Sequence, residues 1–258
     1  MAVVLQIGER QIQAEEIVPL LAGYQMLPQL LREVLIDQAI GEWERSATHA
    51  LYTDEELAAA QQEFYQKNEI NSDETRDEWQ RQYGMTAQQL DQLAVRDLKI
   101  DKYKHATWGH KIESYFLNRK GRLDKAIYSL IRVKDLGLAQ ELYFRVLEGE
   151  QSFSELARTY SEGPEAQTDG LIGPVELSVP HPTLAQILTI SQPGQLIPPT
   201  RIGDWMVIVR LERFVPAQLD DAMRRRLLNE LFETWLQEQL VQLSDASSPD
   251  PAATSTLS

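Results

Sequence analysis

Cysteine is absent from this chain of 258 residues, and histidine is scarce. Without cysteine the chain has no disulfide bond, thiol nucleophile or thiolate-ligated zinc. The four histidines are His49, His105, His110 and His181. No pair of them has the spacing of a zinc-binding motif. We therefore expect neither a metal nor a cofactor.

Long apolar runs and surplus positive charge are missing as well. No stretch approaches the roughly 18 apolar residues that a membrane-spanning helix needs. The opening sequence, Met-Ala-Val-Val-Leu-Gln-Ile, lacks the basic segment of a secretory signal. The formal net charge of −14 disfavours nucleic acid and anionic lipid as partners. These features predict a cytoplasmic protein that binds neither membrane nor nucleic acid.

Apolar residues at helical spacing dominate residues 1–121. One helix face is predicted by Leu27, Leu31, Val34, Leu35 and Ala39. Two further helices are predicted to begin at capping boxes, one from Thr53 to Glu56 and one from Thr86 to Gln89. We expect this region to be mainly helical.

The pattern changes after Gly121. Stretches rich in β-branched and aromatic residues predict strands, and stretches with helical periodicity predict helices between them. The predicted elements are strands at 126–133 and 205–211 and helices at 136–147 and 153–160. Strands at both ends with helices between them indicate an α+β domain over residues 122–214.

A second helical stretch is predicted at 215–243. Its apolar residues recur every four positions, at Leu219, Met223, Leu227, Leu231 and Trp235. Such a stripe must pack against another part of the protein. Residues 244–258 are rich in serine, proline, alanine and threonine, so we expect a disordered tail there.

The middle of the chain carries a spaced set of residues that resembles the parvulin-type (PpiC, or rotamase) peptidyl-prolyl isomerases. The set is Gly149, Phe153, Leu156, Ala157, Tyr160, Ser161, Gly170 and Gly173. The segment from Gly194 to Thr200 is similar to the family's late turn, and residues 205–211 occupy its last strand. Residues 4–12 are similar to the lead-in of SurA- and PrsA-type foldases. The resemblance implies an α+β fold in which a parvulin-like domain is inserted into a mainly helical SurA-like module.

The chain departs from the family at its polar active-site positions. Leu130 and Met206 stand where the family has histidines, and a shift of one residue puts Trp205 in the second position. Gly163 replaces the usual cysteine or aspartate. The sequence therefore identifies no catalytic residue. By position, the resemblance implies a proline pocket formed by Leu130, Gly163, Ile172, His181, Leu184 and Met206. The apolar members of this set could equally be ordinary core residues.

The resemblance implies isomerisation of X-Pro bonds in unfolded or extended protein clients. The barrier to rotation is about 18–20 kcal/mol and arises from amide resonance, so no nucleophile is required. An apolar pocket that binds the twisted amide best could lower the barrier, although missing hydrogen-bond partners should slow the reaction. We expect a weak isomerase. The alternative is a non-catalytic chaperone or adaptor that uses the fold to bind peptide.

Two further points concern partners. SurA- and PrsA-type proteins work outside the cytoplasm, so a secretion system or its substrates is a candidate partner. Residues 54–78 carry nine acidic and two basic residues. One explanation for this acidic excess is that these residues form solvated helix faces. The alternative is that the charge steers client proteins toward the chain.

Overall fold

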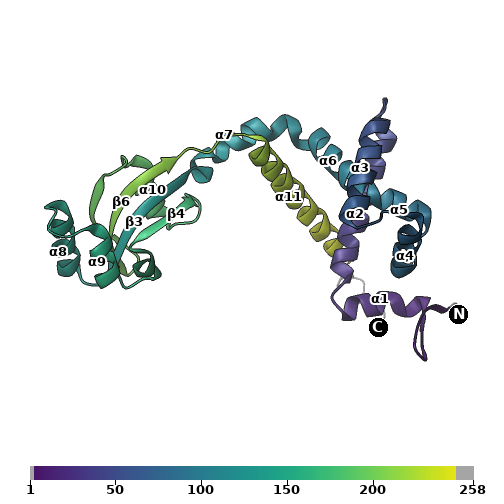
Figure 1. The fold of residues 1–258 in the computed structure, drawn as a ribbon, viewed down its shortest axis with the longest axis horizontal. Helices are drawn as coiled ribbons and strands as arrows, with labels where there is room; N and C mark the ends of the chain where they lie inside the picture. Colours follow the sequence, from purple (N-terminus) through teal and green to yellow (C-terminus); the bar gives the residue numbers. More distant parts are fainter. Residues whose placement is uncertain (1–2, 248–258) are drawn as a thin grey trace, which may run out of the picture. The chain divides into compact units, whose positions relative to one another are not determined.

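The computed structural model describes residues 3–247, which form two compact units (Figure 1). The helical unit comprises the residues up to Ile112 and those from Arg225 onward, and the sheet unit comprises Glu113–Arg224. The last helix continues to Ser247, so the first four residues of the predicted tail are helical. The remainder of that tail, residues 248–258, lies outside the described residues.

The helical unit begins with a hairpin and continues with helices joined by short turns. Its elements are β1 (Val3–Ile7), β2 (Arg10–Gln13), α1 (Ala14–Gly23), α2 (Leu27–Ser46), α3 (Asp54–Lys67), α4 (Asp73–Tyr83), α5 (Ala87–Ala94), α6 (Arg96–Trp108) and the 3-10 turn η1 (Gly109–Lys111). Both predicted capping boxes are confirmed, because the Thr53 and Thr86 hydroxyls accept hydrogen bonds from the third residue of α3 and α5. Among the described helices, none is long and apolar enough to cross a membrane.

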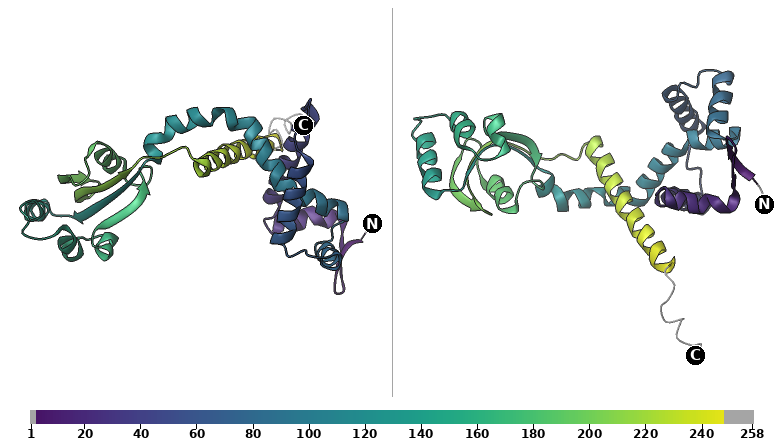
Figure 2. Two further views of the ribbon diagram at one scale, coloured as in Figure 1. Left: turned by 45° about the horizontal axis from the view of Figure 1, so that its top comes forward. Right: turned by 90° about the horizontal axis from the view of Figure 1, so that it is seen from below.

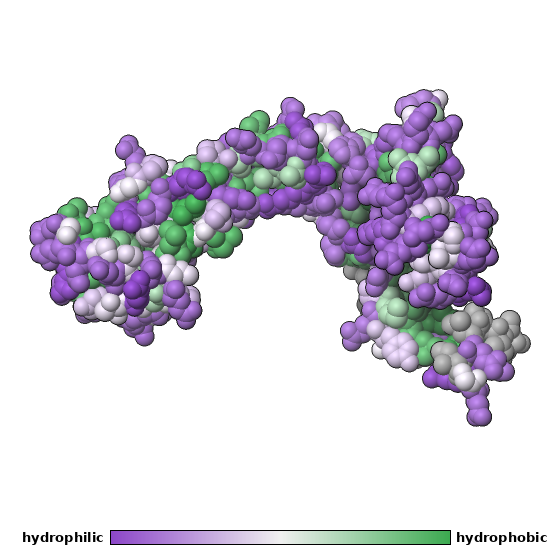
Figure 3. Space-filling view, viewed as in Figure 1, coloured by the Kyte–Doolittle hydropathy of each residue, from purple (hydrophilic) through white to green (hydrophobic). Residues whose placement is uncertain are grey.

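The buried face of α2 differs in part from the predicted one. Ile36 and Ile40 are the buried residues of this helix, whereas Leu31 and Val34 of the predicted stripe are 40% and 52% exposed. Apolar surface is visible over α1 and the start of α2 in Figure 3. The periodicity therefore identified the helix correctly but identified its core-facing side only in part.

An aromatic cluster joins the two ends of the chain within the helical unit. Trp108 of α6 is buried, and its ring centroid lies 5.9 Å from those of Phe232 and Trp235 in α11 (Asp221–Ser247). Nearby, Arg32 donates two hydrogen bonds of 2.7 Å to the Glu233 carboxylate. The last helix thus packs on the helical unit, but its buried residues are Leu227, Leu228, Phe232 and Leu236. Of the predicted stripe only Leu227 is fully buried, and Leu219 precedes the helix.

The sheet unit contains a four-stranded antiparallel sheet in the order β4-β3-β6-β5. Its elements are α7 (Ile112–Leu123), β3 (Lys125–Val133), α8 (Leu136–Leu147), α9 (Phe153–Tyr160), η2 (Pro164–Thr168), β4 (Leu171–Glu176), α10 (Pro182–Ile190), β5 (Leu196–Ile202) and β6 (Trp205–Val215). The four elements predicted here from sequence are confirmed. The edge strands β4 and β5 were missed, because they contain glycine and proline.

Helices cover both faces of this sheet (Figure 2). Side chains alternate along β3, so Tyr128 and Leu130 pack toward α10, whereas Ile131 and Val133 pack toward α8 and α9. The unit therefore has two apolar layers with different chemical surroundings. This alternation decides which predicted site residues can lie together.

Candidate functional site

Three residues of the predicted pocket lie in the layer between the sheet and α10. Leu130, Leu184 and Ile172 belong to one apolar cluster. Leu130 and Leu184 are only 4% and 7% exposed, so core packing accounts for them and they offer a ligand little surface. The partly buried residues of the cluster, Ile172 and Trp205 among them, contribute its accessible apolar surface. The geometry is that of a shallow surface over a packed layer.

Met206 does not join this group. It packs in the opposite layer, against the cluster formed with α8 and α9, whereas its neighbour Trp205 packs with Leu130. Successive residues of a strand point to opposite faces, so only one of the two can reach a given site. The placement of Met206 beside Leu130 was therefore wrong, and the one-residue shift identifies Trp205 instead. The Lys134 ammonium lies 5.4 Å from the centre of the Trp205 ring.

His181 has a structural position at the start of α10. It is the N-cap residue, and its Nδ1 atom accepts a 3.2 Å hydrogen bond from the Thr183 N–H. The side chain is exposed, and Pro182 follows at the first helical position. A contact with substrate stays a prediction for this residue.

A buried ion pair fills the space beside Gly163. The Arg132 guanidinium donates to Glu165 through Nε (2.8 Å) and Nη2 (2.6 Å), and the Glu165 side chain is 1% exposed. Ser161 donates its hydroxyl to the same carboxylate at 2.5 Å and accepts the Arg132 backbone N–H at 3.0 Å. A Cβ atom at position 163 would lie 2.3 Å from Arg132 Nε. Glycine stands here because the ion pair takes the place of a side chain.

The surroundings of Glu165 keep it ionised. Burial by itself raises the pKa of this carboxyl, but the hydrogen bonds from Arg132 and Ser161 outweigh it and hold the pKa below the ordinary glutamate value. The arginine and glutamate therefore form a charge pair with no net charge. Neither residue was identified from the sequence. The signal that could have found them is Gly163, because a glycine at this position leaves room for another side chain.

The glycine of the Asp169-Gly170 turn shows why the spaced motif exists. Its φ is +83°, and an added Cβ would lie 2.7 Å from that of Ala157 in α9. Its N–H donates to the Glu165 carbonyl, and its carbonyl accepts from the Leu130 N–H. Gly170 therefore holds the η2 segment against β3, which places the Arg132–Glu165 pair next to Leu130.

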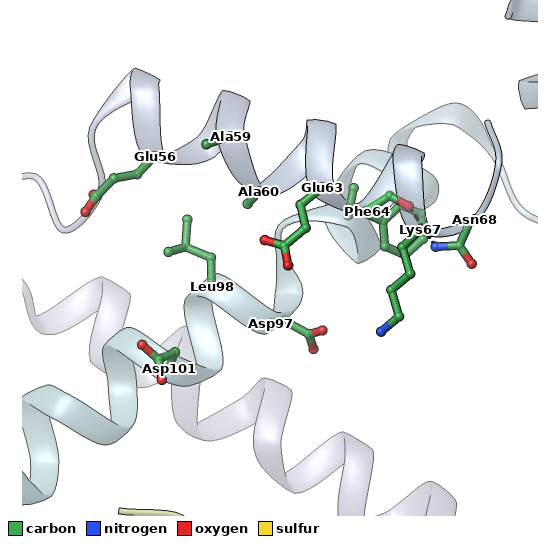
Figure 4. A pocket seen from close by; sticks show the side chains of 11 residues that line it. Glu56, Ala59, Ala60, Glu63, Phe64, Lys67, Asn68, Asp97, Leu98 and Asp101 are labelled. Carbon is green, nitrogen blue, oxygen red and sulfur yellow. Dashed lines mark hydrogen bonds between the residues drawn. The ribbon is translucent and has the colours of Figure 1, made fainter. Parts of the chain in front are cut away.

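The helical unit contains a separate groove of about 580 Å³ between α3 and α6 (Figure 4). Its lining consists of small and apolar residues, four carboxylates, one cation and one amide, namely Ala59, Ala60, Phe64, Ala94 and Leu98, Glu56, Glu63, Asp97 and Asp101, Lys67, and Asn68. Glu63 points from α3 toward α6 in Figure 4. The acidic stretch noted in the sequence thus provides one wall of an apolar groove with an acidic rim.

Comparison with known proteins assigns a class to the sheet unit. Residues 134–213 match the family model described as "Rotamase: PPIC-type PPIASE domain". The chain is 31% identical over 111 residues to the chaperone SurA of Shewanella sp. (strain MR-7), and to that of Shewanella oneidensis. The match covers 39% of this chain and 26% of each SurA, so the chain spans about a quarter of the length of these curated relatives.

Solved structures are similar at lower identity. The peptidylprolyl isomerase PrsA from Bacillus cereus is 18% identical with a TM-score of 0.47, and the match covers 97% of this chain and 95% of that chain. PrsA from Bacillus anthracis is 17% identical with a TM-score of 0.41, over 86% of this chain and all of that chain. The parvulin domain of PpiD from E. coli is 23% identical with a TM-score of 0.33, over 38% of this chain and 95% of that chain.

The sheet unit therefore has an α+β fold and contains a match to the PpiC-type domain family. More particularly, residues 134–213 match a PpiC-type, or parvulin-type, domain, and a stretch of 111 residues is similar to the chaperone SurA. The expectation of an α+β protein with a parvulin-like domain is confirmed. Arg132, two residues after Leu130 on β3, and its partner Glu165 are polar residues close to that position.

Proposed function

We propose that the protein is a peptidyl-prolyl isomerase, or foldase, that acts slowly on X-Pro bonds of unfolded or extended protein clients. The observation that supports this most is the PpiC-type fold with partly buried apolar side chains, Ile172 and Trp205, over the layer that contains Leu130. Contact with apolar side chains desolvates the prolyl amide and favours its twisted state. The cytoplasm is the proposed site of action, and a secretion system or its substrates is a proposed partner.

The first test measures cis/trans exchange in a peptide of the Ala-Pro-Phe type. We expect exchange cross-peaks in NMR spectra with the full chain, at a rate above background but about 100-fold below that of a parvulin that has both histidines, because preorganised hydrogen-bond donors are missing. A protease-coupled assay checks the same rate. A rate equal to that of a parvulin with both histidines would contradict the impaired site. Peptide shifts without exchange would remove the isomerase function.

A second candidate function, a non-catalytic chaperone or adaptor, is favoured by the groove in the helical unit. Its apolar lining and its carboxylates are complementary to a client segment that combines small apolar and basic side chains. Glu63 and Asp97 form no ion pair within 4.0 Å among the described residues, and Lys67 is the cation of the described lining, so the carboxylates leave the groove a net negative charge that suits a cationic ligand.

The groove predicts a charge-dependent affinity for basic clients. Replacing Glu63→Gln together with Asp97→Asn should weaken binding of a Lys- and Leu-containing peptide and reduce the dependence of its affinity on salt, because two attractive charges are lost. Fluorescence titration at two ionic strengths measures both effects. The matched control, Glu15→Gln with Glu78→Gln, removes the same charge from exposed sites outside the groove. Equal affinity and salt dependence in both double variants would exclude the groove.

A further inference from the structure

We propose that the free edge of the Arg132 guanidinium donates a hydrogen bond to the carbonyl oxygen that precedes the proline of a bound client. This inference rests on the proposed isomerase function and adds a substrate-binding residue to it. Arg132 follows the Leu130 position by two residues on β3. Residues i and i+2 of a strand point to the same face and lie about 7 Å apart. The long side chain at position 132 can therefore place a polar group near Leu130, whose own side chain has none.

The guanidinium is held in one orientation and still has donors to spare. Nε and Nη2 bind the two oxygens of Glu165. This bidentate contact uses one edge of the planar group, so the edge that carries Nη1 points away from the carboxylate. Nη1 has no hydrogen-bond partner among residues 3–247, and the Arg132 side chain is 29% exposed. The group is thus a donor held in one orientation on a partly exposed side chain.

The backbone of Arg132 is fixed as firmly as its side chain. Its N–H donates to the Ser161 hydroxyl at 3.0 Å, and its carbonyl accepts from the Glu162 N–H at 2.9 Å. Both partners lie between α9 and η2, just before the segment that Gly170 holds against β3. A donor fixed in this way binds a carbonyl without first being ordered, which is the property that helps a rotating amide most.

The charges around this donor favour a neutral ligand over an anion. Glu165 neutralises Arg132, and the Glu162 carboxylate accepts the Lys134 backbone N–H at 3.1 Å. The Lys134 ammonium lies over the Trp205 ring instead of beside Arg132. The charge of Arg132 is thus paired with Glu165, and the Glu162 carboxylate adds a negative charge beside the backbone of Lys134. A peptide carbonyl gains a strong hydrogen bond here, whereas an acidic residue before proline gains little from the local charge.

Two substitutions separate this role from a purely structural one. Glu165→Gln keeps the size of the side chain and one carbonyl oxygen but removes the negative charge. We expect it to raise the preference for a Glu-Pro peptide over an Ala-Pro peptide roughly threefold, because Arg132 then carries a net charge beside a partly solvated site. Arg132→Lys keeps the charge but loses the planar fork. We expect it to slow exchange about tenfold or more.

The measurement is NMR exchange and chemical-shift titration with both peptides, with hydrogen exchange of the β3 amides as the check on folding. The matched control is Arg158→Lys, which alters an exposed ion pair with Asp169 in the same unit; it should change neither rate nor preference. Suppose that the unsubstituted protein catalyses exchange, that Arg132→Lys catalyses it at the same rate, and that Glu165→Gln has the same preference between the two peptides. The inference is then overturned, and the isomerase function stands.

The remaining outcomes also decide between the two proposals. If the unsubstituted protein binds peptide without exchange, the isomerase proposal fails. The affinity for the peptide is then compared in place of the exchange rate. If Arg132→Lys binds the peptide as tightly as the unsubstituted protein, the inference is overturned too. If the unsubstituted protein produces neither exchange nor shifts, the site itself is absent and both proposals fall together.

Discussion

Arg132→Ala should destabilise the sheet unit by about 3–5 kcal/mol, because it leaves a buried carboxylate without its cation. The Glu165 side chain is 1% exposed and accepts three hydrogen bonds, of which two come from Arg132. With the arginine removed, this carboxylate is ionised without compensation or takes up a proton. Hydrogen exchange of the β3 and β6 amides in the full chain measures the loss.

A double variant distinguishes an orphaned charge from lost packing. Arg132→Met with Glu165→Met removes both charges together and should recover most of the stability that Arg132→Ala loses. Arg158→Ala, which breaks the exposed pair with Asp169, should leave the exchange of these amides unchanged. An Arg132→Ala protein as stable as the unsubstituted one would contradict the account of the buried pair.

Gly163→Cys should destabilise the domain, and it should not raise the isomerase rate to that of a parvulin with both histidines. The substitution introduces the residue type that the family uses, but its Cβ would lie 2.3 Å from Arg132 Nε and 2.4 Å from a Glu165 oxygen. Separations this short force the ion pair apart, so we expect a loss of about 2–4 kcal/mol together with a lower exchange rate. Chemical denaturation and the peptide assay measure the two effects.

The control for this substitution is Gly121→Ala in α7. Apart from its chain neighbours and the backbone of its own helix, no described atom comes within 4 Å of a Cβ at position 121, so alanine should stabilise the helix by about 0.5–1 kcal/mol. A faster isomerase after Gly163→Cys, with stability retained, would mean that the ion pair can move aside at little cost. It would also contradict the fixed orientation that we assign to Arg132.

Elements with local signals could be predicted from the sequence. The capping box at Thr53 and the strand at 126–133 each depend on a few adjacent residues, and each lies where it was expected. The buried face of α2 and the position of Met206 could not be predicted in the same way. Which side of a helix or strand is buried depends on the neighbours that pack there, and those neighbours are distant in sequence.

The candidate site divides along the same line. By itself, the sequence determined the class of domain through the spaced glycines and aromatic residues, and its resemblance to the family predicts that Leu130 stands at a histidine position. Only the tertiary structure brought Arg132 and Glu165 together, because they are 33 residues apart and meet through the turn at Gly170. Contacts of this kind depend on how the chain folds in three dimensions, so they cannot be predicted from a pattern of neighbouring residues.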